Sequence, residues 1–282
     1  MIAIADSGST KTSWIFIDNS GKSYSYKTDG FNPYYQTREN MVNNLQNQLI
    51  AYLEFTDVVD SIYFYGAGCE QPAKTEQVAL ALRQAFPESQ IHVAHDLLAA
   101  AKAVLGDKEG IACIAGTGSN SCYYDGTNVI ENVNSLGLFL GDEGSGGYKG
   151  KILLKAYMRN NLPLDLKQKF EEKYTDRTAE MLDNIYSKPF PSRYLASFTP
   201  FITENIQHEY IYNLVYKSFE DQFDNCISKY ARYKELEVCY IGSVAFFLKD
   251  ILAQVAKDKG VTLGKIIRNP IEGLVEYHTK KS

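Results

Sequence analysis

The sequence of 282 residues has no apolar run that approaches the roughly 18 residues needed to cross a bilayer. Its first residues, Met1 to Asp6, lack a basic segment and soon reach an acid, which favours a first strand over a signal peptide. No block of basic residues occurs, and the net charge is −5. We therefore expect a cytoplasmic protein with neither a nucleic-acid nor a membrane partner. Any bound phosphates would be held by backbone N–H groups and a metal ion rather than by a field of Lys and Arg.

Cysteine is also scarce, and its pattern argues against a disulfide framework. The number is odd, the spacings are wide and no CxxC pair occurs. Buried free thiols in a reducing cytoplasm are the expectation that follows. The five residues are Cys69, Cys113, Cys122, Cys226 and Cys239.

Hydrophobic patterning predicts an α/β unit in the order βββ-α-β-α-β-α, followed by a second copy with a long insertion. In the first copy, strands are predicted at 2–5, 13–17, 23–27, 61–65 and 91–94, and helices at 36–54, 72–86 and 97–105. In the second, strands are predicted at 110–115, 119–124, 128–133 and 238–241, with helices at 244–259 and 270–281.

The two copies predict two lobes that face a cleft. The expected N-terminal lobe spans 1–108, and the expected C-terminal lobe spans 109–267 with a helical insertion at 144–232. The remaining residues, 268–282, are expected to form a helix that packs back on the N-terminal lobe.

The first chemical motif is the turn Asp6-Ser7-Gly8-Ser9-Thr10-Lys11-Thr12 between the first two strands. Glycine lets such a turn present consecutive N–H groups to an anion, and the hydroxyls add donors. Asp6, at a strand end, can hold Mg²⁺ through water. The spacing is not that of a Walker A loop, and the motif alone is equally compatible with a plain hairpin.

A second turn, Gly116-Thr117-Gly118-Ser119-Asn120, lies at the equivalent place in the second copy. Two matching phosphate-type turns are far less common than one. Facing each other across a cleft, they could bracket the β- and γ-phosphates of a nucleotide.

Asp96 follows the strand predicted at 91–94 and begins a helix. Asp is a favoured N-cap residue, and a carboxylate at a cleft edge can also accept a proton from an attacking hydroxyl. The two roles are compatible, so both remain open. The neighbouring His95 should point to the other face and is interpreted as structural.

A third cluster, residues 136–147, combines glycines with Asp142, Glu143 and Ser145 ahead of an apolar helix. Either acid could bind sugar hydroxyls, whereas a loop with Ser145 as N-cap would explain only part of the run.

Two further segments are weaker signals. Gly242-Ser243 joins a strand to a helix, where a flat base can approach the backbone, but many α/β crossovers look the same. Asn32 follows the third strand and could bond sugar hydroxyls or an amide, or it could simply belong to a loop that contains proline.

Taken together, these motifs resemble the N-acetylglucosamine kinase family. They are DSGSTKT at 6–12, HD at 95–96, GTGSNS at 116–121, GDEGSGG at 141–147 and GSV at 242–244. That family belongs to the BadF/BadG-type ATPase group within the actin, hexokinase and heat-shock-70 fold superfamily. The resemblance covers nearly the whole chain, and GTGSN followed by GDEGS is specific to this group.

The resemblance implies an α/β fold of two RNase H-like lobes with ATP between them. It implies phosphoryl transfer from ATP, with Mg²⁺, to a hydroxyl of N-acetylglucosamine or a related amino sugar, at the 6-position. The implied catalytic residue is Asp96 and the implied Mg²⁺ residue is Asp6. The implied ATP-binding residues are Gly8, Ser9, Thr10, Lys11, Thr117, Gly118, Gly242 and Ser243. The implied sugar-binding residues are Asn32, Ser119, Asn120 and Asp142.

The sequence departs from the family pattern in two places. Ser7 and Ser9 stand where glycines are usual, so nucleotide affinity is expected to differ. Pro33-Tyr34-Tyr35 replaces a His-Trp type segment, which bears on recognition of the N-acetyl group. Alternatives left open are an ATP-driven activator that shares an iron–sulfur cluster, a non-catalytic sensor, and a kinase for glucosamine, glucose or muramic acid derivatives. The oligomeric state is open too, a homodimer included.

Overall fold

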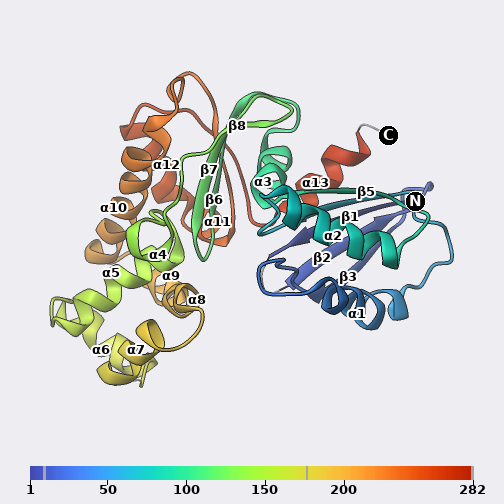
Figure 1. Ribbon diagram of the computed structural model, residues 1–282. Coiled ribbons are helices and arrows are strands. Elements are labelled where there is room, and N and C mark those ends of the chain that lie inside the picture. The colour runs from blue at the N-terminus through green and yellow to red at the C-terminus, as the bar shows by residue number, and fades with distance from the viewer. Residues whose placement is uncertain (9–10, 176, 281–282) are drawn as a thin grey trace. The chain divides into compact units, whose positions relative to one another are not determined.

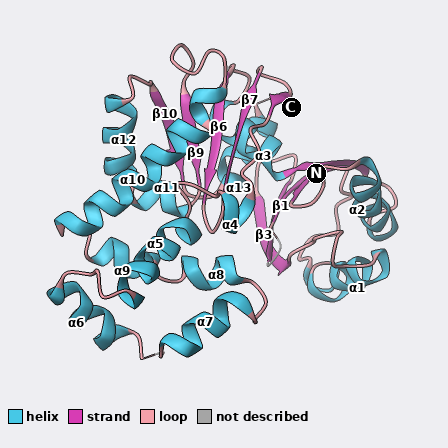
Figure 2. Ribbon diagram, turned by 60° about the vertical axis from the view of Figure 1, so that its left-hand side comes forward, coloured by secondary structure: helices cyan, strands magenta, loops and turns pink. Residues whose placement is uncertain are grey.

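The computed structural model describes residues 1–8, 11–175 and 177–280 (Figures 1 and 2). Ser9 and Thr10, both predicted to bind phosphate, therefore lie outside the described residues. The chain divides into two compact units. Unit 1 comprises Met1–Gly106 and Asn269–Ser282, and unit 2 comprises Asp107–Arg268.

Unit 1 is built on a five-stranded sheet in the order β3-β2-β1-β4-β5. Its strands are β1 (Ile2–Ser7), β2 (Lys11–Ile17), β3 (Ser23–Asp29), β4 (Ser61–Gly66) and β5 (Gln90–His95). The first three are antiparallel, whereas β4 and β5 run parallel to β1. The carboxyl ends of β1, β4 and β5 therefore meet at one edge, where ligands bind in open α/β sheets.

Helices cover both faces of this sheet (Figure 1). They are α1 (Arg38–Gln48), the 3₁₀ turn η1 (Ile50–Tyr52), α2 (Pro72–Ala85), α3 (Asp96–Leu105) and α13 (Pro270–Thr279). Alternation along β2 buries Trp14 and Phe16 on the face covered by α1 and α2, where Leu45 and Leu82 join the same core. On the opposite face His278 of α13 stacks on β4.

Unit 2 repeats this topology with a sheet in the order β10-β9-β6-β7-β8. Its strands are β6 (Gly110–Ala115), β7 (Ser119–Tyr124), β8 (Val129–Glu131), β9 (Val238–Ile241) and β10 (Leu263–Ile267). As in unit 1, three strands form an antiparallel meander and two run parallel to the first. The predicted repeat of one α/β unit is therefore confirmed, and β10 is a strand that the sequence reading missed.

Helices of unit 2 fall into an insertion and a sheet-covering pair. The insertion holds α5 (Gly146–Met158), α6 (Leu164–Lys173), α7 (Thr178–Tyr186), α8 (Pro191–Ala196), α9 (Thr199–Glu204), α10 (Glu209–Asn225) and η2 (Ile227–Lys229), preceded by the short α4 (Gly137–Leu140). After β9 come α11 (Ser243–Phe247) and α12 (Lys249–Asp258). Figure 2 shows α6 to α9 gathered beyond one end of the sheet of unit 2.

Two predicted helices are shorter than expected. The helix predicted at 36–54 ends at Gln48, before a separate 3₁₀ turn, and the one predicted at 244–259 is divided at Leu248. All five cysteines are buried and free, as expected. In the described part of the chain, no helix is both long and apolar enough to cross a membrane.

Candidate active site

The parallel strands of unit 1 bring two predicted carboxylates to the same edge. Ser7, the last residue of β1, is in register with Gly66 of β4, which is in register with His95 of β5. Asp6 therefore lies one residue before the end of its strand, and Asp96 directly follows the end of β5. The two are 90 residues apart in sequence but lie close enough for the charge of Asp96 to raise the pKa of Asp6.

The first predicted phosphate turn begins later than its sequence suggests, because Ser7 belongs to β1 and pairs with Thr12. Its buried hydroxyl lies 2.7 Å from that of Thr12 and accepts the N–H of Phe31 at 2.9 Å. Ser7 therefore lies in a strand, where no glycine is needed, although glycine is usual at this position of the family motif. The N–H of Gly8 donates to the carbonyl of Lys11 at 3.0 Å across the turn. Both residues are exposed.

His95, rather than Asp96, caps helix α3. The Nδ1 atom of His95 accepts the N–H of Leu98 at 3.2 Å, and Asp96 is the first residue of the helix. The interpretation of Asp96 as N-cap is thus wrong, whereas a structural role for His95 is confirmed. Burial lowers the pKa of His95, which keeps the imidazole neutral and able to accept this bond. The carboxylate of Asp96 is therefore not needed as the cap, although the backbone N–H groups of Leu97 and of Asp96 itself lower its pKa to a small extent.

Both carboxyl groups at this edge have raised pKa values. Burial and the charge of Asp96 raise the pKa of Asp6 to about 7, although Lys11 lowers it. Burial is also the main cause of the raised pKa of Asp96, with a further contribution from Glu70. Glu70, in the loop after β4, was not singled out from the sequence. The sequence indicated its position only indirectly, because Glu70 lies four residues after β4, a strand that ends at the same edge.

A carboxylate whose pKa is raised by a like charge is a fitting partner for a divalent cation, which would relieve that repulsion. Among the described residues, no group of three or more His, Cys, Asp and Glu side chains could form a complete protein cage for a metal. Mg²⁺ does not require one, because one or two carboxylates, water and substrate phosphates are its usual ligands. Asp6 therefore fits the predicted role.

Asn32 lies against the loop that follows β4. A Cβ added to Gly68 would lie 3.1 Å from the Oδ1 atom of Asn32, so the two segments touch. The same Oδ1 accepts the N–H of Tyr34 at 3.0 Å and so stabilises the turn of its own loop. Asn32 thus stabilises its own proline-containing loop, as one reading of the sequence suggested. It also lies at the sheet edge that holds Asp6 and Asp96.

In unit 2 the second predicted turn and the third cluster come together. The N–H of Ser119 donates to Oδ1 of Asp142 at 3.3 Å, and a Cβ on Gly118 would lie 3.2 Å from Oδ2 of the same residue. Asp142 is buried and adopts a left-handed backbone (φ 58°). Burial is the main cause of its raised pKa. Thr117, at the tip of the turn, is exposed.

Backbone bonds fix this turn to the start of α5. The N–H groups of Gly146 and Gly147 donate to the carbonyls of Gly116 and Thr117, at 2.8 and 3.0 Å. A Cβ at 146 would lie 2.9 Å from Oγ1 of Thr199, and one at 147 would lie 3.0 Å from the carbonyl oxygen of Thr117, so glycine favours this close approach. Ser145 caps α5 by accepting the N–H of Tyr148 at 3.0 Å, as its position suggested.

The predicted adenosine motif, Gly242-Ser243, lies against the end of β6, directly before the turn at 116–120. Gly242 has φ +121°, and a Cβ there would lie 2.3 Å from the carbonyl oxygen of Ala115, at the end of β6. Ser243, next to it, is exposed. Asn120 differs from the other predicted residues, because its Oδ1 already accepts bonds from the N–H of Ser121 and the Nδ2 of Asn132. Its side chain therefore links β7 to Asn132, the residue that follows β8.

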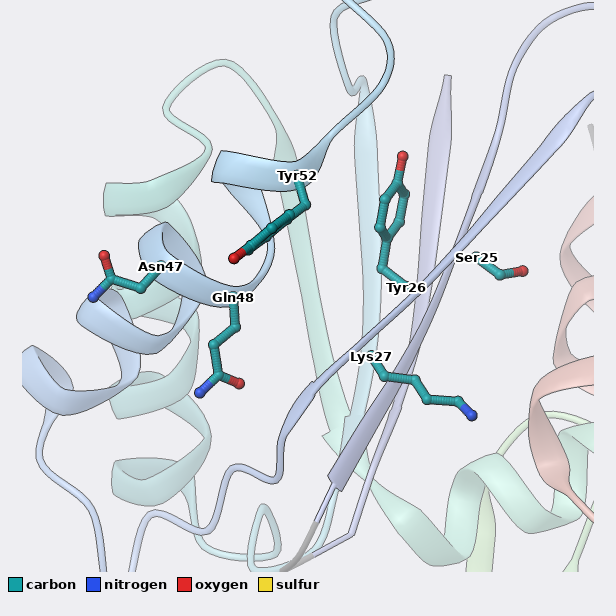
Figure 3. A pocket seen from close by; sticks show the side chains of 6 residues that line it. All are labelled: Ser25, Tyr26, Lys27, Asn47, Gln48 and Tyr52. Carbon is teal, nitrogen blue, oxygen red and sulfur yellow. The ribbon is translucent and has the colours of Figure 1, made fainter.

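A pocket of about 580 Å³ lies elsewhere on unit 1, between β3 and the C-terminal part of α1 (Figure 3). Tyr26 extends from the strand and Tyr52 from the 3₁₀ turn opposite, with Gln48 below Tyr52 in the view. None of the predicted site residues lines this pocket. The predicted chemistry thus belongs to the strand ends and their turns.

Comparison with known proteins agrees with the strand order and the motifs. Residues 5–266 match the BadF/BadG/BcrA/BcrD ATPase family. The chain belongs to this family. A solved structure from Porphyromonas gingivalis, named as a candidate N-acetylglucosamine kinase, is 41% identical, covers 99% of both chains and has a TM-score of 0.93.

More distant structures share the fold alone. A candidate N-acetylglucosamine kinase from Chromobacterium violaceum is 17% identical over 98% of this chain and 99% of its own, with a TM-score of 0.74. A ROK hexokinase from Thermus thermophilus is 14% identical over 100% of this chain and 99% of its own, with a TM-score of 0.50. Among curated proteins, none matches. The predicted two-lobe α/β fold of this ATPase family member is confirmed.

Proposed function

We propose that this member of the BadF/BadG/BcrA/BcrD family is an ATP-dependent sugar kinase that phosphorylates N-acetylglucosamine or a related amino sugar, at O6. The 41% identical protein from P. gingivalis, named as a candidate N-acetylglucosamine kinase, supports the substrate class. The observation that carries the proposal is the release of Asp96 from helix capping by His95, at the strand edge that also holds Asp6.

The proposed base is Asp96. A raised pKa brings a carboxylate nearer to the operating pH and makes it a better acceptor for a hydroxyl proton. As the sugar oxygen forms its bond to the γ-phosphorus, the bond from that phosphorus to the β–γ bridging oxygen breaks, ADP leaves, and the hydroxyl proton passes to Asp96. Mg²⁺ near Asp6 would neutralise charge on the phosphates.

Other residues are proposed to bind and orient. Lys11 and Thr117 are exposed residues of the two turns that would bind the phosphates, together with Gly8, Ser9, Thr10 and Gly118. The N–H of Gly8 already donates to the carbonyl of Lys11, so Gly8 would act by shaping its turn. Gly242 and Ser243 would approach the adenosine. The proposed sugar-binding residues are Asp142, Ser119 and Asn120 of unit 2 and Asn32 of unit 1. Positioning of this kind supplies much of the catalysis of phosphoryl transfer.

The alternative of an iron–sulfur activator is less well supported, because all five cysteines are buried within the units. A sensor without turnover would not need a proton acceptor, yet Asp96 retains the position and environment of one. Neither alternative is favoured by a specific contact.

A coupled ADP-release assay with Mg²⁺-ATP tests the proposal against N-acetylglucosamine, glucosamine, glucose, N-acetylmannosamine and N-acetylmuramic acid. We expect strong stimulation by an amino sugar, with the phosphate located on O6 by NMR of the product. ATP binding without stimulation by any sugar would refute the kinase assignment.

A further inference from the structure

Lys149, on α5, is fully buried, which is rare for lysine. Its Nζ donates to the carbonyl oxygen of Gly144 at 2.5 Å and lies 3.8 Å from the centre of the Phe219 ring. Burial alone accounts for its strongly lowered pKa, with no carboxylate contributing among the described residues. The amine therefore makes its polar contact with a backbone carbonyl rather than with an acid.

Removing the lysine amine from water costs free energy, so its retention in the core suggests a role beyond packing. Replacing a buried charged or polar group by an apolar side chain of similar volume is often neutral or stabilising. Position 149 also lies on the face of α5 that carries Leu153 and Ala156, both in the core, so an apolar residue would suit it. Stability of unit 2 alone does not explain a lysine there.

The carbonyl that Lys149 binds lies in the middle of the predicted sugar loop. Gly144 has φ +79°, and a Cβ there would lie 2.3 Å from Oε1 of Gln222 on α10. Two residues before it is Asp142, whose carbonyl accepts the N–H of Ser145 at 3.1 Å. The peptide units between Asp142 and Ser145 thus form one tight turn, and Lys149 reaches back from the next turn of α5 to hold it.

Helix α10 supports the same loop from the insertion. Besides the ring of Phe219 under the Lys149 amine, Asn225 donates to Glu143 at 2.9 Å and Asp221 accepts the Tyr148 hydroxyl at 2.8 Å. Residues 160–232 of the insertion, in which the sequence shows no motif, therefore have a physical route to the sugar side of unit 2.

We infer that Lys149 is a positioning residue: by holding the Gly144 carbonyl against α10, it fixes the turn that orients Asp142 toward the sugar. This inference rests on the proposed function. The amine keeps N–H donors whether or not it is charged, so the role does not depend on its ionisation state.

The test compares Lys149→Met, which keeps length and apolar volume but removes the donor, with Lys155→Met on the exposed face of the same helix. In Lys149→Met we expect the KM for the sugar to rise about tenfold, as for one lost hydrogen bond, with the KM for ATP unchanged. We expect the melting temperature to be equal to that of the wild type or higher. Lys155→Met should change none of these.

A second readout does not need activity. Amide hydrogen exchange of residues 141–147 should be about tenfold faster in Lys149→Met than in the wild type. Lys149→Gln retains an N–H donor, so its exchange rate should lie between those of the wild type and Lys149→Met. If the wild type phosphorylates no sugar, the proposed function fails while exchange still tests the role of Lys149. Unchanged exchange and KM with a higher melting temperature would overturn the inference. So would failure of Lys149→Met to fold, since the lysine would then serve general stability.

Discussion

Asp6 and Asp96 lie close enough that the negative charge of one raises the pKa of the other, although they come from the ends of two different strands. Nothing in a plain hairpin or a capped helix requires two desolvated acids at one sheet edge. Their proximity follows from the parallel arrangement of β1, β4 and β5. We expect the pair to be the chemical centre of unit 1.

The first prediction concerns the proposed base. Asp96→Asn keeps the size of the side chain but removes the proton acceptor, so kcat should fall at least about 100-fold. ATP affinity, measured by calorimetry, should stay within about threefold, because His95 still caps α3. Turnover close to that of the wild type would contradict the assignment of Asp96.

The second prediction concerns Asp6 and pH. Its pKa in the folded protein is about 7, well above its ordinary value of 3.8, so the folded state holds the proton more tightly than the unfolded state does. The stability that protonated Asp6 provides is complete below about pH 4 and is lost as the pH rises to about 7. Asp6→Asn removes this dependence.

Melting temperatures in metal-free buffer check this sign. Relative to Asp6→Asn, the wild type should lose at least about 2 °C between about pH 5 and pH 8. Added Mg²⁺ and ATP analogue should stabilise the wild type more at the higher pH, where the carboxylate is free to bind a cation. A melting-temperature difference between the two proteins that stays constant with pH would contradict the raised pKa.

Local patterns explain what the sequence could predict. A strand followed by glycine and hydroxyl residues predicts both candidate phosphate turns, because alternation and turn chemistry are encoded within about ten residues. The repeated topology follows from the same signals. In contrast, β10 has a half-buried pattern with Gly264 inside it, where a Cβ would lie 2.5 Å from Cys239. A strand shaped by such a close neighbour carries a weak alternation signal.

Tertiary contacts decide what the sequence could not. Whether His95 or Asp96 turns back to cap α3 depends on the packing around β5, since either side chain can accept a backbone N–H. The proximity of Glu70 to Asp96 depends on the path of a loop. The burial of Lys149 could have been inferred from its helical spacing to Leu153 and Ala156. Lysine is so seldom buried, however, that its residue type predicts a surface position.

The third prediction concerns the cap itself. His95→Ala should lower stability by about 1 kcal/mol, because Leu98 loses its acceptor. In that variant the neighbouring carboxylate of Asp96 is the nearest replacement cap, so kcat should fall as well. His95→Asn, which keeps an acceptor at the cap, should restore most of both. Thermal unfolding and steady-state kinetics on the three proteins provide the comparison, and equal kcat in all three would show that capping and catalysis are independent.

The last prediction separates the two glycines of the second turn. A Cβ on Gly118 would lie 3.2 Å from the buried carboxylate of Asp142, whereas one on Gly116 would meet none of the described atoms within 4 Å. Gly118→Ala must therefore displace Asp142 or the turn, and should raise the KM for the sugar several-fold with some loss of stability. Gly116→Ala should leave the melting temperature and the sugar KM unchanged.

The same pair reports on the nucleotide. Because Gly116→Ala has no steric conflict with the residues that the structure describes, a rise in the KM for ATP would reflect close approach of the ligand to that backbone. We expect such a rise if this turn binds phosphate, without the accompanying change in the sugar KM that Gly118→Ala produces. Identical effects of the two variants on both substrates would mean that the contact between Gly118 and Asp142 does not link the turn to the proposed sugar site of unit 2.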